Sequence, residues 1–361
     1  MPHLARPRGG GRRDLAVNGE DPTLCRSDGG LVELAHGAGG PAMRSLIESI
    51  FLAGVNDAEA LAMGDGAAIL LGDRWLVLTT DAHVVAPVFF PGGDIGRLAV
   101  SGVVNDLAMM GACDPLALTS SVIVEEGFPL DSLRRIQASM VATCSEAGTR
   151  IVTGDTKVMR RGELDGVVLS TSGVGLTHRV VRDSGLCVGD DILVTGTIGD
   201  HGLAVLSARN DLGLDGDLRS DVAPLNSLIR AALTAAGDAL HAMKDPTRGG
   251  VISALSEMAD KAGVAILLDQ ASLPISAPAR AAAELLGIDP LAVANEGKAL
   301  LGVHPSVTSA TLAALRAHPL GRDAACIGRV RAGVRGTLML DTGFGTRRLL
   351  ERDGDPLPRI C

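Results

Sequence analysis

The stretch FFPGGDIGRLAVSGVVNDLAMMGA, residues 89–112, decides the fold that we predict for this chain. It opens with a Gly-Gly loop and continues as a helix, with Asp94 as the N-cap and Gly111 as the residue that ends it. Apolar residues form a stripe along this helix: Ile95, Leu98, Ala99, Leu107 and Met110. Asn105 and Asp106 lie in the middle, where both residue types are poor helix formers. Because the residues that flank them are all apolar, we interpret this pair as more than a solvated face.

On both sides of this stretch, apolar strands alternate with amphipathic helices. The pattern predicts strands over 75–81, 115–127 and 165–177, and a helix over 131–148 with Asp131 as its N-cap and Gly148 as its end. The second half of the chain predicts helices near 199–208, 225–236, 250–262, 277–287 and 306–317, and strands near 189–196, 264–269, 298–303, 325–330 and 336–340. Neither a GxGxxG fingerprint nor a GxxxxGK[ST] phosphate loop is present. We therefore predict an α+β (α/β) fold of two domains, with mixed sheets flanked by helices.

The predicted boundaries follow shifts in composition. Residues 1–30 are rich in Arg and Gly and have no apolar core, so they predict a disordered leader rather than a signal peptide. We expect an N-terminal domain over 31–180 and a C-terminal domain over 185–345. Residues 346–361 end in PLPRIC and predict a mobile tail that carries Cys361.

Composition excludes several classes of function. The net charge of −9 argues against a nucleic-acid partner and against binding to an anionic membrane. No apolar run approaches the roughly 18 residues of a membrane span. The six cysteines form no CxxC pair, and without an export signal they are expected to be reduced thiols of a cytoplasmic protein.

Several segments place acids and glycines at strand ends or within apolar helices. GDGAAIL (64–70) sets Asp65 before a strand, TTDAHVV (79–85) sets Asp81 at a strand end, and VTGDTKV (152–158) ends a short strand on Gly154, Asp155, Thr156 and Lys157. Carboxylates suit Mg²⁺, glycines let backbone N–H groups approach phosphates, and a lysine stabilises a transferring phosphoryl group. Each motif alone is as typical of a plain turn as of a functional site. Together the motifs predict a site for Mg²⁺ and a polyphosphate.

The second half adds three segments of the same kind. IGDHGLAVLSAR (198–209) begins a helix beside His201, and its N–H groups predict an anion site. KDPTRGGVISALSE (244–257) is another loop-to-helix entry, and ANEGKALLGV (294–303) places Glu296 in a short polar turn. Helix capping or a plain turn explains each of these equally well when it is taken alone.

These stretches together resemble the HypE family of hydrogenase maturation proteins. The resemblance is carried by HGAGG, GDGAA, TTDAHVV, the 89–112 stretch, VTGDTKV, GDHG, DPTRGG, NEGK and the terminal PRIC, and it runs from about Val32 to Cys361. That family belongs to the superfamily of aminoimidazole-ribonucleotide synthetase, selenophosphate synthetase and thiamine-monophosphate kinase, which share a two-domain α/β fold. Two positions depart from the superfamily pattern: Gly66 replaces a second acid, and Ala82 a small hydroxylic residue.

The resemblance implies a homodimeric, ATP-dependent carbamoyl dehydratase. A HypF-type carbamoyltransferase would load an S-carbamoyl group onto Cys361. Dehydration with ATP and Mg²⁺ would convert it to a thiocyanate, and the cyanide would pass to iron on a HypC–HypD scaffold for a [NiFe] hydrogenase.

The resemblance also implies roles for residues. Asp65, Asp81 and Asp106 would hold Mg²⁺, and the nucleotide would be bound by Asp65, Asp81, Asn105, Gly154, Asp155 and Thr156. Cys361, Lys157, Glu296 and His201 would be catalytic, with Glu296 the first candidate for the base and His201 the second. Two alternatives stay open: another ATP-dependent kinase or synthetase of this superfamily, and a non-catalytic carrier whose Cys361 delivers a ligand.

Overall fold

The computed structural model describes residues 30–212 and 218–351, and the predicted leader and the Cys361 segment lie outside these ranges. From Glu33 onward the described residues belong to one compact unit. No helix in that part of the chain is both long enough and apolar enough to cross a membrane.

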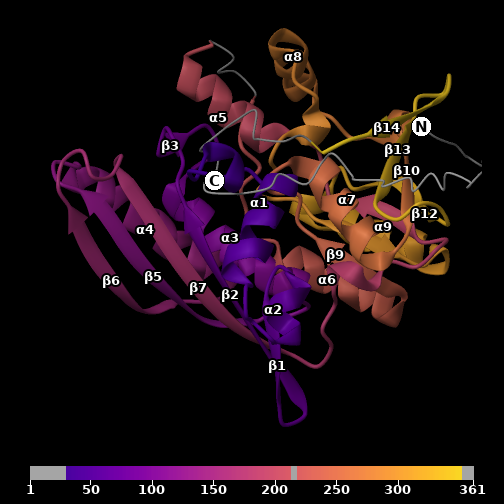
Figure 1. Ribbon diagram of the computed structural model, residues 1–361, viewed down its shortest axis with the longest axis horizontal. Coiled ribbons are helices and arrows are strands. Elements are labelled where there is room, and N and C mark those ends of the chain that lie inside the picture. Colours follow the sequence, from indigo (N-terminus) through magenta and orange to yellow (C-terminus); the bar gives the residue numbers. More distant parts are fainter. Residues whose placement is uncertain (1–29, 213–217, 352–361) are drawn as a thin grey trace, which may run out of the picture. The chain divides into compact units, whose positions relative to one another are not determined.

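The first sheet has five strands in the order β1-β2-β7-β5-β6. Its strands are β1 (Ala67–Leu71), β2 (Arg74–His83), β5 (Pro115–Glu125), β6 (Ile151–Met159) and β7 (Val167–Thr177). β5 and β6 run parallel, and the other neighbours run antiparallel. The sheet is therefore mixed, and β6 lies at its edge (Figure 1).

The second sheet has seven strands in the order β14-β13-β10-β12-β8-β11-β9. They are β8 (Asp191–Val194), β9 (Leu240–Lys244), β10 (Ala265–Asp269), β11 (Leu300–Val303), β12 (Ala325–Arg331), β13 (Thr337–Asp341) and β14 (Thr346–Leu349). Only the β10–β13 pairing is parallel. A separate two-stranded ribbon joins β3 (Phe89–Phe90) to β4 (Gly93–Asp94). These mixed sheets with flanking helices confirm the predicted fold class.

Helices cover both sheets. They are α1 (Gly40–Leu46), α2 (Ala58–Ala62), α3 (Ile95–Met109), α4 (Leu130–Ala147), α5 (Asp200–Asn210), α6 (Asn226–Ala236), α7 (Gly250–Ala262), α8 (Ala277–Leu286) and α9 (Thr308–Ala317). Short helical turns lie at Leu34–Gly37, Ile47–Phe51, Asp183–Gly185, Gly237–Ala239, Gln270–Ser272, Pro290–Ala292, Pro305–Val307 and Pro319–Gly321. α7 packs in one apolar cluster of the second sheet, and α6 and α9 pack in another.

α3 is buried on all sides and joins the two halves of the protein. It packs against α4 and against β2 and β7 of the first sheet, and it also contacts α6 and β9 of the second half. The Asp94 carboxylate caps its first turn by accepting from the N–H groups of Gly96 and Arg97, and Gly111 ends it with a φ of +87°. These contacts confirm the predicted bounds, and they explain why the helix is apolar nearly all round.

A glycine of α3 sets the close approach of α3 to β2. A Cβ on Gly102 would lie 2.8 Å from Nε2 of His83 and 3.2 Å from Oδ2 of Asp81. Any larger side chain would therefore displace the end of β2, which carries both residues. The position needs glycine for space, since its φ is that of an ordinary helix.

Four local predictions need correction. Asp131 is not an N-cap, because α4 begins at Leu130 after Pro129, and its carboxylate pairs with Arg134 instead. β9 was not predicted, because its neighbours along the sequence are polar. Residues 346–349, assigned to the tail, form β14 and pair with β13. β6 does not end at Gly154, since residues 154–157 continue the strand.

Candidate functional site

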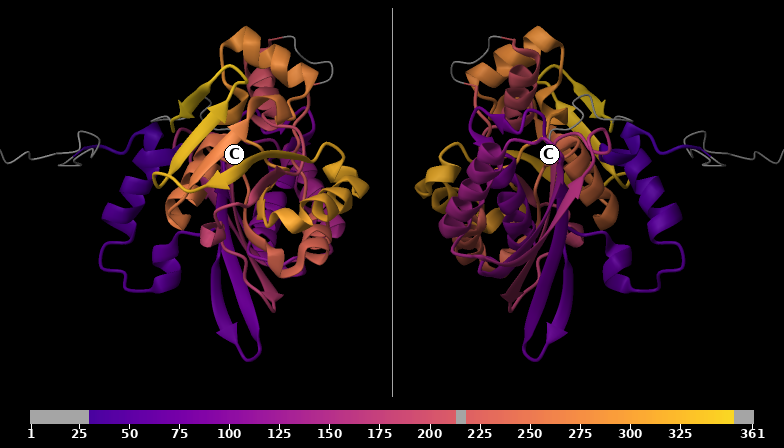
Figure 2. Two further views of the ribbon diagram at one scale, coloured as in Figure 1. Left: turned by 90° about the vertical axis from the view of Figure 1, so that its right-hand side faces the viewer. Right: turned by 90° about the vertical axis from the view of Figure 1, so that its left-hand side faces the viewer.

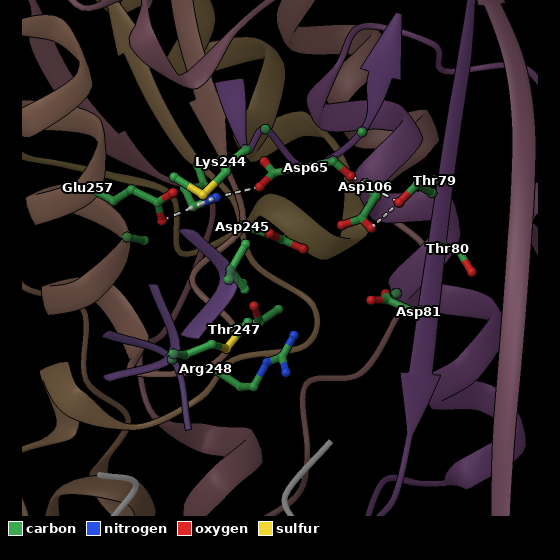
Figure 3. A pocket seen from close by; sticks show the side chains of 18 of the residues that line it. Asp65, Thr79, Thr80, Asp81, Asp106, Lys244, Asp245, Thr247, Arg248 and Glu257 are labelled. Atoms are coloured by element: carbon green, nitrogen blue, oxygen red, sulfur yellow. Dashed lines mark hydrogen bonds and ion pairs between the residues drawn. The ribbon is translucent and has the colours of Figure 1, made fainter. Parts of the chain in front are cut away.

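A pocket of about 520 Å³ lies where β1, β2 and α3 face α1, α7 and the segment after β9. Small-molecule sites commonly have this volume. Its wall is rich in carboxylates: Glu59, Asp65, Asp81, Asp106, Asp245, Glu257, Glu296 and Glu351. Arg44, Lys244 and Arg248 are the basic residues of the wall. Figure 3 shows carboxylates and basic groups facing each other across the opening.

Three predicted metal ligands meet in this pocket. Asp65 lies in the turn before β1, Asp81 near the end of β2, and Asp106 in the last turns of α3 (Figure 3). The Thr79 hydroxyl links two of them, because it lies 2.7 Å from Oδ2 of Asp106 and 3.0 Å from the carbonyl oxygen of Asp65. The sequence therefore predicted correctly that these acids gather.

A chain of ion pairs forms one wall of the pocket. The Lys244 ammonium pairs with Asp65 and lies 3.7 Å from Oε2 of Glu257. Lys261 binds Oδ2 of Asp183 at 2.6 Å and Oε1 of Glu257 at 2.8 Å. Burial opposes the charge of Lys244, but the surrounding carboxylates, Asp65 first among them, raise its pKa well above the usual range. This wall connects the turn before β1 to β9 and α7.

Burial and like charges disfavour ionisation of two further acids of the pocket, Asp106 and Asp245. Burial, and next the charges of Asp81 and Asp245, raise the pKa of Asp106 well above its usual range. Burial, and next Asp65, raise the pKa of Asp245 to about 7. A bound cation would relieve this repulsion, and carboxylate oxygens are the ligands that Mg²⁺ takes in proteins. The residues present therefore fit a divalent cation together with an anionic ligand.

Glu296 faces the same pocket from a buried turn. The side chain is 3% exposed, and its Oε1 has no hydrogen-bond partner among the described residues. Burial, and next the charge of Asp245, raise its pKa well above the usual range. The turn itself is held by a bond of 3.0 Å from the Glu296 N–H to Oδ1 of Asp221. A carboxyl group with a raised pKa is suited to exchange a proton with a ligand.

Asn105 is buried in α3 but is not among the residues that line the pocket. Its amide nitrogen donates to the carbonyl oxygens of Ala223 and Glu296, at 3.1 and 3.2 Å, and its Oδ1 accepts from the N–H of Leu225 at 2.7 Å. All of these partners are backbone groups of the second half. The residue fastens α3 to that half, and its predicted contact with nucleotide stays a prediction.

His201 lies outside the pocket wall as well. It is fully buried, its Nδ1 lies 2.8 Å from Oγ of Ser220, and its ring packs edge-on against Phe90. The anion site expected at the start of α5 stays a prediction, although two of the N–H groups there already have acceptors within the protein. The Gly199 N–H donates to Oδ1 of Asn295 and the Gly202 N–H to the carbonyl oxygen of Ala294, so the protein itself uses these groups.

The structure does not bring Gly154, Asp155, Thr156 and Lys157 to the pocket of their own chain. All four are exposed on β6, the edge strand, and three other strands separate β6 from β1. Sequence alone placed them at a strand end beside the other acids. Their roles in binding and catalysis stay predictions. Within one chain these four residues do not reach the pocket.

Sequence reasoning missed two functional residues of the pocket, Lys244 and Asp245. They lie at the end of β9, which was not predicted because it is only five residues long. The available signal was the rule already used for Asp81, an acid where a strand ends. Thr247 and Arg248 of the same segment, noted above only as a helix entry, also line the pocket (Figure 3).

Comparison with known proteins first gives the class. Residues 64–177 match the family described as AIR synthase related protein, N-terminal domain, and residues 188–341 match its C-terminal domain. The chain therefore belongs to this family of two-domain proteins, as the fold and the site predicted.

Closer relatives give the particular family. The chain is 46% identical over 335 residues to the carbamoyl dehydratase HypE of Rhizobium leguminosarum bv. viciae, covering 92% of this chain and 95% of that protein. It is similar to the crystal structure of a HypE–HypF complex, with a TM-score of 0.81, 42% identity and coverage of 85% and 100% of the two chains. It is also similar to a HypE crystal structure in complex with ATP, with a TM-score of 0.77, 39% identity and coverage of 92% and 100%. The chain belongs to the HypE family of carbamoyl dehydratases and is an enzyme.

The raised pKa of Asp245 predicts how stability depends on pH without metal or nucleotide. Its folded-state pKa of about 7 lies above the ordinary 3.8, so the folded state holds a proton that the unfolded state has lost. This contribution to stability is complete below about pH 4 and is lost as the pH rises through 7. We expect Asp245→Asn to reduce the loss of stability with rising pH. The substitution should raise the free energy of unfolding at pH 8 by about 1–4 kcal/mol.

Urea denaturation between pH 5 and 8 measures this effect. Asp131→Asn is the matched control, because the Asp131 side chain is 90% exposed, and it should follow the wild-type curve. Equal slopes for Asp245→Asn and the wild type would contradict the repulsion that we assign to the pocket.

Proposed function

We propose that this enzyme uses ATP to dehydrate an S-carbamoyl group on Cys361 to a thiocyanate, which supplies the cyanide ligand for assembly of a [NiFe] hydrogenase. The observation that carries the proposal is the position of Glu351, the last described residue, which lines the acidic pocket. Its carboxylate lies 3.6 Å from Nη2 of Arg44 on α1. Ten residues follow up to Cys361 and can span at most about 35 Å, so the thiol is within reach of this pocket.

The chemistry needs a way to remove an oxygen atom that is a poor leaving group. In our proposal the carbonyl oxygen of the thiocarbamate attacks the γ-phosphorus of ATP, and ADP leaves. One N–H proton is lost as the imidate phosphate forms. Loss of the second N–H proton and of phosphate then breaks the C–O bond and leaves S–C≡N on Cys361. The oxygen atom of the eliminated water thus ends in the phosphate product, and its two hydrogen atoms leave as protons.

Glu296 is the residue that we assign to proton removal. Its buried carboxyl group faces the pocket with a free Oε1, and its raised pKa makes the carboxylate a stronger base than an exposed glutamate. His201 is the weaker candidate, because Ser220 and Phe90 hold its ring away from the pocket wall. Asp65, Asp81 and Asp106, with Asp245, would hold Mg²⁺. When bound, that ion offsets charge on the phosphates.

We assign two kinds of partner. A HypF-type carbamoyltransferase would load Cys361, an inference that the relative crystallised as a HypE–HypF complex supports. A HypC–HypD scaffold would receive the cyanide. We further infer a cytoplasmic location, because the four described cysteines are free thiols.

The decisive experiment is the intact mass of the protein loaded by its carbamoyltransferase. We expect a carbamoyl adduct that loses the mass of one water only when Mg-ATP is added, and no adduct on Cys361→Ala. Glu296→Gln should accept the adduct but lose water at least about a hundredfold more slowly. An adduct that never loses water would favour the carrier instead. Turnover of ATP on a small molecule without any adduct would favour a kinase or synthetase.

We also propose that the enzyme acts as a homodimer in which β6 of one copy completes the pocket of the other. The face of the first sheet opposite α3 carries half-buried or exposed side chains, including Leu78 at 37% exposure and Ile69 at 53%. Hydroxyl groups lie among them, with Thr80 and Ser172 2.9 Å apart. The β1–β2 hairpin extends beyond its neighbours (Figure 2). An apolar face of this kind suits a second copy.

This arrangement would give Lys157 a role that it cannot have within one chain. The lysine would reach the phosphates bound in the other copy and stabilise charge on the transferring group.

Coexpression of two inactive variants tests the arrangement. Asp81→Asn and Lys157→Ala should each abolish dehydration, since each pocket would lack one component. Random pairing of the two variants restores both components in about one site in four, so we expect about a quarter of wild-type activity. Asp81→Asn paired with Glu296→Gln is the control, because both residues line the pocket of the same chain, and it should stay inactive. No recovery with Lys157→Ala would contradict the shared pocket.

A further inference from the structure

A cysteine, an aspartate and a histidine meet outside the pocket, beside the second sheet. Cys187 and Asp190 lie in the turn that leads into β8, and His241 lies on β9. A donor atom of each residue, sulfur, carboxylate oxygen and ring nitrogen, lies within 4.8 Å of the other two. None of the three lines the acidic pocket, and the activity proposed above makes no use of them.

The carboxylate of Asp190 organises the cluster. Nδ1 of His241 lies 2.9 and 3.0 Å from its two oxygens, almost symmetrically, and Oδ2 also accepts from the Cys187 N–H at 2.8 Å. Asp190 is 1% exposed, whereas Cys187 is exposed at the surface. The buried acid therefore holds the other two donors toward a position that a solute can reach past the thiol.

The backbone around the cluster is held on both sides. The Asp190 N–H donates to the carbonyl oxygen of Cys187, which closes the turn. The Gly189 N–H donates to the carbonyl oxygen of Val330, and the Val330 N–H donates to that of Asp190, which fixes the turn to β12. On the other side, a Cβ on Gly185 would lie only 2.1 Å from the His241 carbonyl oxygen, so the approach to β9 is as close as a backbone permits. The donors are thus carried by well-supported elements, as a metal site requires.

The donor set selects a class of metal. A thiolate and an imidazole are poor ligands for Mg²⁺ or Ca²⁺, but with a carboxylate they match the sulfur, nitrogen and oxygen ligands of Zn²⁺. Three protein ligands leave a fourth position open. The His304 ring packs against that of His241, with the two ring centroids 6.3 Å apart. The plain alternative is a histidine–aspartate pair that satisfies a buried acid, beside a thiol that donates to the carbonyl oxygen of Gly185 at 3.6 Å.

We propose that Cys187, Asp190 and His241 form a Zn²⁺ site. Binding would release the thiol proton and would clamp β9 to the turn before β8. β9 ends in Lys244, which pairs with Asp65 in the acidic pocket, so this metal would stabilise the strand that supports one wall of that pocket. The site does not depend on the proposed dehydration, because its donors lie outside the pocket.

Titration of the full-length protein with Co²⁺ tests the site, because cobalt takes zinc ligands and reports a bound thiolate through its charge-transfer absorption. We expect one equivalent of Co²⁺ to produce that band and Zn²⁺ to displace it. Cys187→Ser should abolish the band, and its exposed position leaves the core unchanged. His241→Asn keeps a hydrogen-bond donor beside Asp190 and should weaken Co²⁺ binding at least about tenfold.

Two cysteine variants serve as controls. Cys326→Ser removes a half-buried thiol of the same domain, and Cys361→Ser removes the proposed acceptor; both should keep the band. The absence of a thiolate band in the wild type would overturn the proposal. A band that survives in Cys187→Ser, or full affinity in His241→Asn, would overturn it as well.

Discussion

Repulsion among carboxylates in one desolvated pocket is the constraint to which the surrounding structure responds. Burial, and next the charges of neighbouring carboxylates, raise the pKa values of Asp106, Asp245 and Glu296. A fold retains such a cluster only where other contacts offset it. Here the offset comes from Lys244 and from the packing that holds the acids in place. A bound cation, together with an anionic nucleotide, would offset the remaining repulsion among these carboxylates.

The packing that holds the acids comes mainly from α3. This helix is buried between the first sheet and the second half of the protein, so Asp106 meets Asp65 and Asp81 from β1 and β2 on one side. On the other side, the amide of Asn105 binds the backbone just before α6 and at the turn that carries Glu296. A shift of α3 would therefore move the acids and the assigned base together. The same helix thus couples the geometry of metal binding to the geometry of proton transfer.

Much of this arrangement could be predicted from the sequence, and the failures share a cause. Asp65, Asp81, Asp106 and Glu296 were found because each follows a local rule: an acid beside glycine, at the end of a strand or within an apolar helix. Lys157 lies away from the pocket of its own chain because its position depends on the order of strands in the sheet, which local patterns do not contain. Backbone and side-chain partners from distant segments hold Asn105 and His201, and the roles predicted for these residues in nucleotide binding and proton removal stay predictions.

Other misses also depend on distant contacts. β9 is five residues long and was not predicted, so the rule that an acid lies where a strand ends was not applied to Lys244 and Asp245. Asp131 has the right residue type for a cap but lies one residue inside the helix, after a proline that begins it. The chemistry of the site could thus be predicted from the sequence. The contacts that support the site became known only from the structure.

The most direct test of this account is the affinity for ATP measured by calorimetry with and without Mg²⁺ at pH 8, where Asp245 is ionised. Because the pocket presents several carboxylates to an anionic ligand, we predict that ATP binds at least about tenfold more weakly without Mg²⁺. Asp81→Asn should reduce that difference by removing one of the charges. Equal affinity with and without Mg²⁺ would contradict the claim that these acids bind the nucleotide through a cation.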